Sequence, residues 1–262
     1  MLDKAHDGKS IDELVAAFQG KGADGKGLFD FMRSQSERLR KLNRERCSET
    51  MMQTLRSFMK FRGGIDICLE KLTKDIVEQY EAWLKGRGLK RNTSSFYLRT
   101  LRNAYNIAVD EGLTDDKQLF RKVYTGVDKT IKRAIGIEDI RAIKRLDLRN
   151  TPSLEMTRDI LMFSFYMRGM SFVDMAYLSK KNLQGPRIVY CRKKTGQQLT
   201  IEVLPEAKEI IDKYESDSQY LLPIIKTENG DVRRQCKNAI TMVNRNLKKI
   251  GAMVGLTDSL TT

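Results

Sequence analysis

Apolar residues recur at three- and four-residue spacing through the first half of the chain, which is the period of helices with one buried face. Thr73 is a predicted N-cap and Gly86 the predicted end of one such helix. Another is predicted to begin at Asn92 or Thr93 and to finish at Gly112. Because the connections are short, residues 28–112 are predicted to form a compact bundle of about four helices.

The second half of the chain mixes two periods. Two segments alternate between apolar and polar residues on either side of a turn with glycine, which predicts an antiparallel hairpin. The expected fold class is mainly α with a small antiparallel β-sheet. A turn is expected at Asn229 and Gly230. The predicted strands are 187–192 and 199–204, and the predicted helices are 137–146, 153–167, 205–214 and 232–254.

Two further segments carry weaker patterns. Residues 10–19 have one apolar face and are predicted to form a short helix, while the glycine-rich stretch 20–27 is interpreted as a flexible linker. Residues 113–135 are polar and basic without sustained periodicity, so we expect a domain boundary there, between 125 and 126. A cationic connector could lie along DNA or be solvated, and the sequence allows both.

Charge indicates the class of partner. The chain has 48 Lys plus Arg against 34 Asp plus Glu, a net charge of +14. Neutralised phosphates release counterions, so this surplus favours a polyanionic partner such as nucleic acid. A basic protein that binds no nucleic acid is the alternative.

Cysteine and histidine usage excludes several kinds of site. The four cysteines are scattered and form no C-x-x-C pair, which argues against disulfides or zinc and fits a reducing cytoplasm. The one histidine, His6, leaves no His-ligated metal cluster, Ser-His-Asp hydrolase or Cys-His protease. No apolar run approaches the roughly 18 residues of a membrane span, so no membrane partner is expected.

An apolar helix is predicted to end on Arg168, with Gly169 allowing a change of direction and a new helix beginning near Ser171. A guanidinium held rigidly in this way can grip a phosphate with two parallel hydrogen bonds. An arginine that only stabilises the helix C-terminus is the alternative.

The predicted hairpin has the sequence Lys193-Lys194-Thr195-Gly196 at its tip. These lysines could be solvated, reach into a groove, or donate a proton to a leaving oxygen. Lys-Thr-Gly also occurs in penicillin-binding proteins, and Ser57 and Lys60 have S-x-x-K spacing. We discard that interpretation because the pair lies in a helical bundle, no S-D-N lies between the motifs, and the charge is unusual for such an enzyme.

The order of these features resembles the tyrosine recombinases, in particular integrases of mobile and conjugative elements. The likeness runs from about Leu28 to Thr262 and rests on Arg-Gly-Met-Ser-Phe-Val-Asp-Met at 168–175, on the hairpin lysines, and on Leu101-Arg102-Asn103-Ala104. It implies an N-terminal segment (1–27), a helical SAM-like core-binding domain (28–125) and a partial catalytic domain (126–262). The implied partner is double-stranded DNA, on which the chain would form dimers to tetramers, with no small-molecule substrate.

The resemblance also implies a chemistry. In this family a tyrosine hydroxyl attacks a DNA phosphodiester to give a 3′-phosphotyrosyl link, and fixed cations stabilise the transition state without metal or other cofactor. Lys194 matches the family's hairpin lysine, with Lys193 second. Ser171 stands where the first arginine is expected, and Arg168 is expected to substitute for it.

The sequence departs from the family at its other end. No His-x-x-Arg segment follows Leu256, and no tyrosine follows Tyr220. The 262 residues are therefore expected to be a C-terminally truncated recombinase that binds DNA without cleaving it. A non-catalytic DNA-binding accessory or regulatory protein is the alternative, and a helical interaction module with incidental basicity is a third hypothesis.

Basic side chains at helical spacing are the candidate DNA contacts, with solvated helix faces as the alternative. One set surrounds the start of the helix near Thr93, one lies at the hairpin, and one begins the last helix. The predicted contacts are Lys90, Arg91, Arg99, Arg102, Lys193, Arg233 and Arg234.

Overall fold

The computed structural model describes residues 27–130, 134–227 and 230–262. The predicted helix at 10–19, most of the glycine-rich stretch, His6 and the turn residue Asn229 lie outside the described residues. The chain divides into two compact units between Thr130 and Ile131, whereas the sequence places the boundary between 125 and 126.

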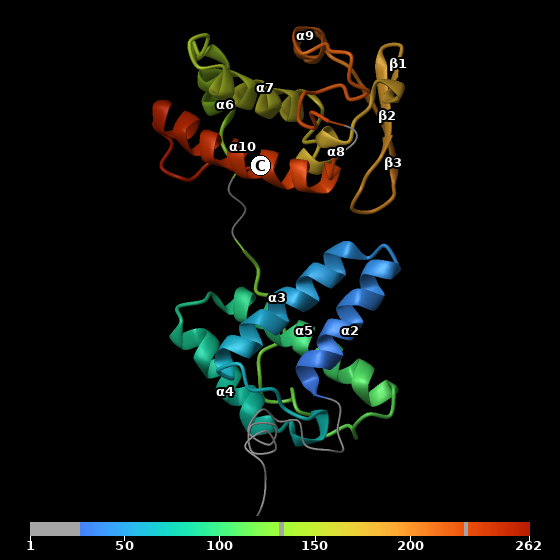
Figure 1. Ribbon diagram of the computed structural model, residues 1–262. Coiled ribbons are helices and arrows are strands. Elements are labelled where there is room, and N and C mark those ends of the chain that lie inside the picture. The colour runs from blue at the N-terminus through green and yellow to red at the C-terminus, as the bar shows by residue number, and fades with distance from the viewer. Residues whose placement is uncertain (1–26, 131–133, 228–229) are drawn as a thin grey trace, which may run out of the picture. The chain divides into compact units, whose positions relative to one another are not determined.

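The first unit is a helical bundle, as predicted (Figure 1). Thr73 is confirmed as an N-cap, because its Oγ1 accepts a hydrogen bond of 3.3 Å from the Ile76 amide. Phe58 and Tyr80 meet edge to face at 4.9 Å in the core and are both fully buried. The elements are α2 (Leu28–Lys41), α3 (Glu45–Phe61), the 3-10 turn η1 (Leu69–Lys71), α4 (Lys74–Gly86) and α5 (Arg91–Asp110).

The interpretation of residues 113–135 as a polar connector is wrong for its first part. Leu119, Phe120 and Val123 are buried in the core of the first unit. Tyr105 anchors the same stretch, since its hydroxyl donates to the Asp115 carbonyl at 2.6 Å and accepts from the Lys117 amide at 3.0 Å. The segment buries these side chains without forming a helix or strand, so it shows no regular period for sequence analysis to detect.

The second unit is mainly α with a small antiparallel sheet, which confirms the predicted fold class. The sheet has the order β1-β2-β3, and Val189 pairs with Thr200 across β2 and β3. β1 was not expected, because two residues are too few to show alternation. The elements are α6 (Ile137–Arg145), α7 (Pro152–Tyr166), α8 (Phe172–Ala176), η2 (Lys180–Asn182), β1 (Leu183–Gln184), β2 (Arg187–Cys191), β3 (Gln198–Glu202), α9 (Pro205–Lys213) and α10 (Val232–Met253).

Helix α7 lies at the centre of the second unit and packs against α6, α9 and α10 (Figure 1). Its Asp159 carboxylate is nearly buried and accepts hydrogen bonds from Lys213 Nζ at 2.6 Å and from the Tyr214 hydroxyl at 2.9 Å. Arg158 Nε donates to the same carboxylate at 2.9 Å. This polar cluster fixes α9 on α7, and so supports the helix that precedes Arg168.

Candidate nucleic-acid interface

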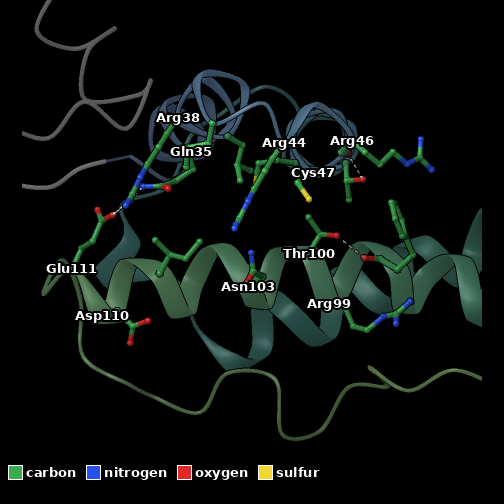
Figure 2. A pocket seen from close by; sticks show the side chains of 16 residues that line it. Gln35, Arg38, Arg44, Arg46, Cys47, Arg99, Thr100, Asn103, Asp110 and Glu111 are labelled. Atoms are coloured by element: carbon green, nitrogen blue, oxygen red, sulfur yellow. Dashed lines mark hydrogen bonds and ion pairs between the residues drawn. The ribbon is translucent and has the colours of Figure 1, made fainter. Parts of the chain in front are cut away.

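A cavity of about 860 Å³ opens on the first unit between the junction of α2 with α3 and the exposed side of α5. Figure 2 shows Arg38, Arg44 and Arg46 on the α2–α3 side and Arg99 on α5, with Arg44 pointing toward Asn103. The cavity therefore gathers cations from segments that are far apart in the sequence.

The arginines of this cavity differ in how far they are neutralised. Arg38 Nη1 lies 3.2 Å from Glu111 Oε1, and Arg46 Nη1 lies 3.9 Å from Glu49 Oε2. Within the described part of the chain, the Arg44 guanidinium has no hydrogen bond or ion pair. The Nε of Arg99 is buried, also without a partner among the described residues. A buried donor is rarely left unpaired, so the Arg99 Nε is available to an anion, and the exposed Arg44 guanidinium is open to one from solvent.

The structure separates the basic residues predicted around the start of α5. Arg99 lines the cavity, and Lys90 is exposed at the N-cap of α5. Arg91 and Arg102 instead contact residues 124–128, which follow the buried stretch described above. Arg44 and Arg46 were not predicted as DNA contacts. The basic run around the α2–α3 junction was the available signal, but only the fold shows that it faces α5.

In the second unit, α7 is followed by two successive residues of left-handed backbone. Arg168 has φ 56° and Gly169 has φ 77°. Ser164 brackets the turn, because its carbonyl accepts from the Gly169 amide and its hydroxyl donates to the Met170 carbonyl, both at 2.8 Å. Arg168 is exposed, and its guanidinium pairs with no other residue that the structure describes. Left-handed backbone at a non-glycine residue is costly and concentrates at functional sites.

Replacing Arg168 by glycine is expected to stabilise the second unit by about 1 kcal/mol relative to alanine at the same position, because only glycine adopts this φ without strain. Urea unfolding of Arg168→Gly and Arg168→Ala measures the difference. Equal stability of the two variants would contradict a strained Arg168. The same pair of substitutions at Arg149, an exposed residue outside any helix or strand, is the control.

Asp174 joins the start of α8 to the hairpin. Its Oδ2 accepts from the Ser171 hydroxyl at 2.7 Å, and its Oδ1 accepts from the Lys193 amide at 2.8 Å. The carboxylate is 2 % exposed, with Arg192 Nε 4.0 Å away. Ser171 also caps α8 by accepting from the Asp174 amide. Asp174 was not predicted to hold the hairpin, because its contact with the Lys193 amide exists only in the fold.

The two hairpin lysines have different surroundings. The Lys193 Nζ lies 4.5 Å from the centre of the Tyr177 ring, and both residues line a small cavity of about 160 Å³. Lys194 is exposed and forms no interaction with the described residues. Burial raises the pKa values of Tyr177 and Tyr190, which also line this cavity. Lys193 is thus held against the protein, whereas Lys194 extends into solvent.

Helix α10 presents the last basic set. Asp231 caps it by accepting from the Arg234 amide at 2.9 Å, and Arg234 is exposed while Arg233 is half-buried. The helix contains no acidic residue. Its cationic side chains belong to Arg233, Arg234, Lys237, Arg245, Lys248 and Lys249.

Other kinds of site are not found in the part of the chain that the structure describes. No group of three or more His, Cys, Asp or Glu side chains there could hold a metal ion. None of its helices combines the length and apolar character needed to cross a membrane. Cys47, Cys68, Cys191 and Cys236 are all free thiols.

Comparison with known proteins decides the family of the first unit. Residues 27–123 match the family model of the phage integrase SAM-like domain. This region is a phage integrase SAM-like domain. The match and the structural similarities below confirm the resemblance to tyrosine recombinases. No curated protein matches the chain.

Solved integrase structures share the fold over most of the chain. A lambda integrase dimer bound to a COC′ core site has a TM-score of 0.66 at 15% identity, covering 90% of this chain and 84% of that one. A lambda integrase tetramer bound to a Holliday junction has a TM-score of 0.65 at 15% identity, and the match covers 97% of this chain and 70% of that one. The Tn1549 transposon integrase in complex with circular intermediate DNA has a TM-score of 0.58 at 13% identity, and the match covers 91% of this chain and 82% of that one. At identities this low, the structural similarity shows a common fold.

Proposed function

We propose that this chain is a site-specific DNA recombinase of the tyrosine type, and that its integrase SAM-like domain binds duplex DNA through the cavity beside α5. The observation that carries the proposal is the pair of unneutralised guanidiniums, Arg44 and Arg99, in that cavity. Phosphate oxygens are their natural partners, and the phosphate contacts would position α5 on the duplex. The similar lambda and Tn1549 structures are DNA complexes, two of them a dimer and a tetramer, which supports DNA as partner and assembly upon it.

Sequence readout is proposed for the polar residues of α5 that share the cavity. Thr100 and Asn103 line the cavity from the same helix as Arg99 and face the α2–α3 side in Figure 2. An asparagine side chain can bond an adenine edge in the major groove at two points, whereas the arginines contact the backbone. The other contacts predicted from the sequence stay predictions. They are Lys90, Arg91, Arg102, Lys193, Arg233 and Arg234.

At the second unit we propose that Arg168 binds the scissile phosphate and Lys194 is the general acid. A tyrosine hydroxyl that has lost its proton to water attacks phosphorus, and the new bond forms as the bond from phosphorus to the 5′ oxygen breaks. Lys194 then gives its proton to the 5′ oxygen, which leaves as a hydroxyl. The free Arg168 guanidinium and the solvent-facing Lys194 side chain support these roles. Ser171 is proposed to position Asp174, which holds the hairpin.

For these 262 residues alone we propose DNA binding without cleavage. The tyrosines near the proposed site are poor nucleophiles, since Tyr190 is 7% exposed and burial raises its pKa and that of Tyr177. The Tyr214 hydroxyl donates a hydrogen bond to the Asp159 carboxylate. A cytoplasmic location and an origin in a mobile element stay predictions.

A suicide substrate tests the proposal. Nicked duplexes of random sequence, in which the cleaved strand loses a short fragment, trap any phosphotyrosyl adduct. The expected result is binding that weakens with salt and no covalent product. A covalent adduct would contradict binding without cleavage, and no binding at low salt would contradict the interface.

A non-catalytic DNA-binding protein on the same scaffold is the second candidate. Ser171, standing where the family's first arginine is expected, favours it, because a serine cannot neutralise the phosphate charge. The coding sequence after Thr262 separates the two hypotheses. A His-x-x-Arg segment and a later tyrosine support the recombinase, and their absence supports the accessory protein.

A further inference from the structure

Residues 124–128 are fastened along the amino-terminal half of α5. Asn92 forms two reciprocal bonds with Asp128, donating to its carbonyl at 3.0 Å and accepting from its amide at 2.8 Å. Ser95 donates to the Gly126 carbonyl at 2.5 Å. Gly126 permits this path, since a Cβ there would lie 2.8 Å from the Tyr124 ring. The segment that leads to the boundary between the units is thus held by specific contacts.

An ion pair between Arg91 and Asp128 is part of this docking. Its guanidinium lies 3.7 Å from the centre of the Tyr124 ring and its Nη1 lies 3.4 Å from Asp128 Oδ1, which also accepts from the Tyr124 hydroxyl at 2.6 Å. The Arg91 and Asp128 side chains are 60% and 41% exposed. An ion pair so open to solvent contributes at most about 1 kcal/mol.

Arg91 lies on the helix that forms one side of the cationic cavity. The hydrogen bond to Asp128 raises the pKa of Tyr124, while the guanidiniums of Arg91 and Arg99 oppose that rise. Arg91 and Arg99 are eight residues apart on α5, a rise of about 12 Å along the helix, and Arg99 also lines the cavity. A DNA backbone seated in the cavity would pass close to Arg91.

We propose that Arg91 is a DNA phosphate site which Asp128 occupies in the DNA-free protein, so that a phosphate and the Asp128 carboxylate exchange on Arg91 when DNA binds. This inference rests on the proposed function. A phosphate that displaces the carboxylate forms hydrogen bonds with the Arg91 guanidinium and releases a counterion from the DNA. The contact between Arg91 and Asp128 must be broken first, which reduces the net gain. The carboxylate thereby acts as an internal competitor that weakens DNA binding.

The experiment compares Asp128→Asn with Asp115→Asn in the full chain. Asparagine keeps the size of the side chain and the backbone bonds to Asn92. Asp115 is an exposed residue of the same unit whose contact is made through its carbonyl, so its variant has the same charge change without the Arg91 contact. Anisotropy of a labelled random duplex, measured over a series of NaCl concentrations, gives affinity and salt slope.

Asp128→Asn is expected to bind about fivefold tighter than Asp115→Asn with an unchanged salt slope, because the Arg91–phosphate contact forms in both complexes. In an Arg91→Ala background the two variants should bind equally, because the competitor then has no site. Equal affinities with Arg91 present would overturn the inference. A gain that persists without Arg91 would also overturn it, since Asp128 would then only repel DNA. No salt-dependent binding by the unaltered chain would overturn the proposed function and, with it, this exchange.

Discussion

Replacing Arg44 and Arg99 together by alanine is expected to weaken duplex binding about 10- to 100-fold and to make the salt slope shallower by about two. Each guanidinium that contacts a phosphate releases about one counterion, so two lost contacts account for the change in slope. The loss should be nearly the same for every DNA sequence, because backbone contacts carry no base information. Anisotropy at several NaCl concentrations measures both quantities.

A matched control removes two charges that are already neutralised. Arg33 lies 2.6 Å from Asp30 and Lys85 lies 2.9 Å from Glu81, on α2 and α4. The double variant Arg33→Ala with Lys85→Ala loses the same net charge as the test variant. If it weakened binding as much, the effect would come from total charge, and the cavity would not be the interface.

Asp174→Ala is expected to destabilise the hairpin against α8 by about 2 kcal/mol, since it removes two charge-assisted hydrogen bonds from a buried carboxylate. The direct readout is hydrogen exchange at the Lys193 amide, which donates to this carboxylate. Exchange there should accelerate about 30-fold if it proceeds by local opening, because 1.4 kcal/mol corresponds to a factor of ten.

Two further variants make this prediction specific. Asp174→Asn keeps an oxygen that can accept from the Lys193 amide. The exchange rate of this amide in Asp174→Asn should therefore lie between those of the wild type and Asp174→Ala. Asp147→Ala removes a carboxylate of the same unit that pairs with Arg149 at the surface, and it should leave the Lys193 amide unchanged. Equal exchange rates in the wild type and Asp174→Ala would show that the turn is held by other contacts.

The sequence predicted most of the regular elements because each one carries its own signal. Helices α4, α5 and α10 begin and end within a few residues of their expected positions, since caps and apolar periods are local. Even the five-residue helix α8 was anticipated, because Gly169 and Ser171 mark its start. Strand β1 and the buried stretch containing Phe120 were missed, because neither repeats at a helical or strand period.

The candidate site was predictable only where its residues are neighbours in sequence. Arg168, Ser171 and Lys194 belong to motifs that can be recognised along the chain. The placement of Arg44 and Arg99 in one cavity could not be predicted, because it depends on how α2, α3 and α5 pack. The engagement of Arg91 by Asp128 was hidden for the same reason: these residues are 37 positions apart and meet only in the fold.

The left-handed backbone at Arg168 has a consequence for how such chains evolve. Most substitutions destabilise a protein, and those at a strained residue are an exception when they supply glycine. In a lineage with no use for the guanidinium, a random mutation from arginine to glycine at this position would therefore favour folding. We expect descendants that have lost recombination to drift toward glycine there, so an arginine kept at the end of α7 would record continuing selection for its side chain.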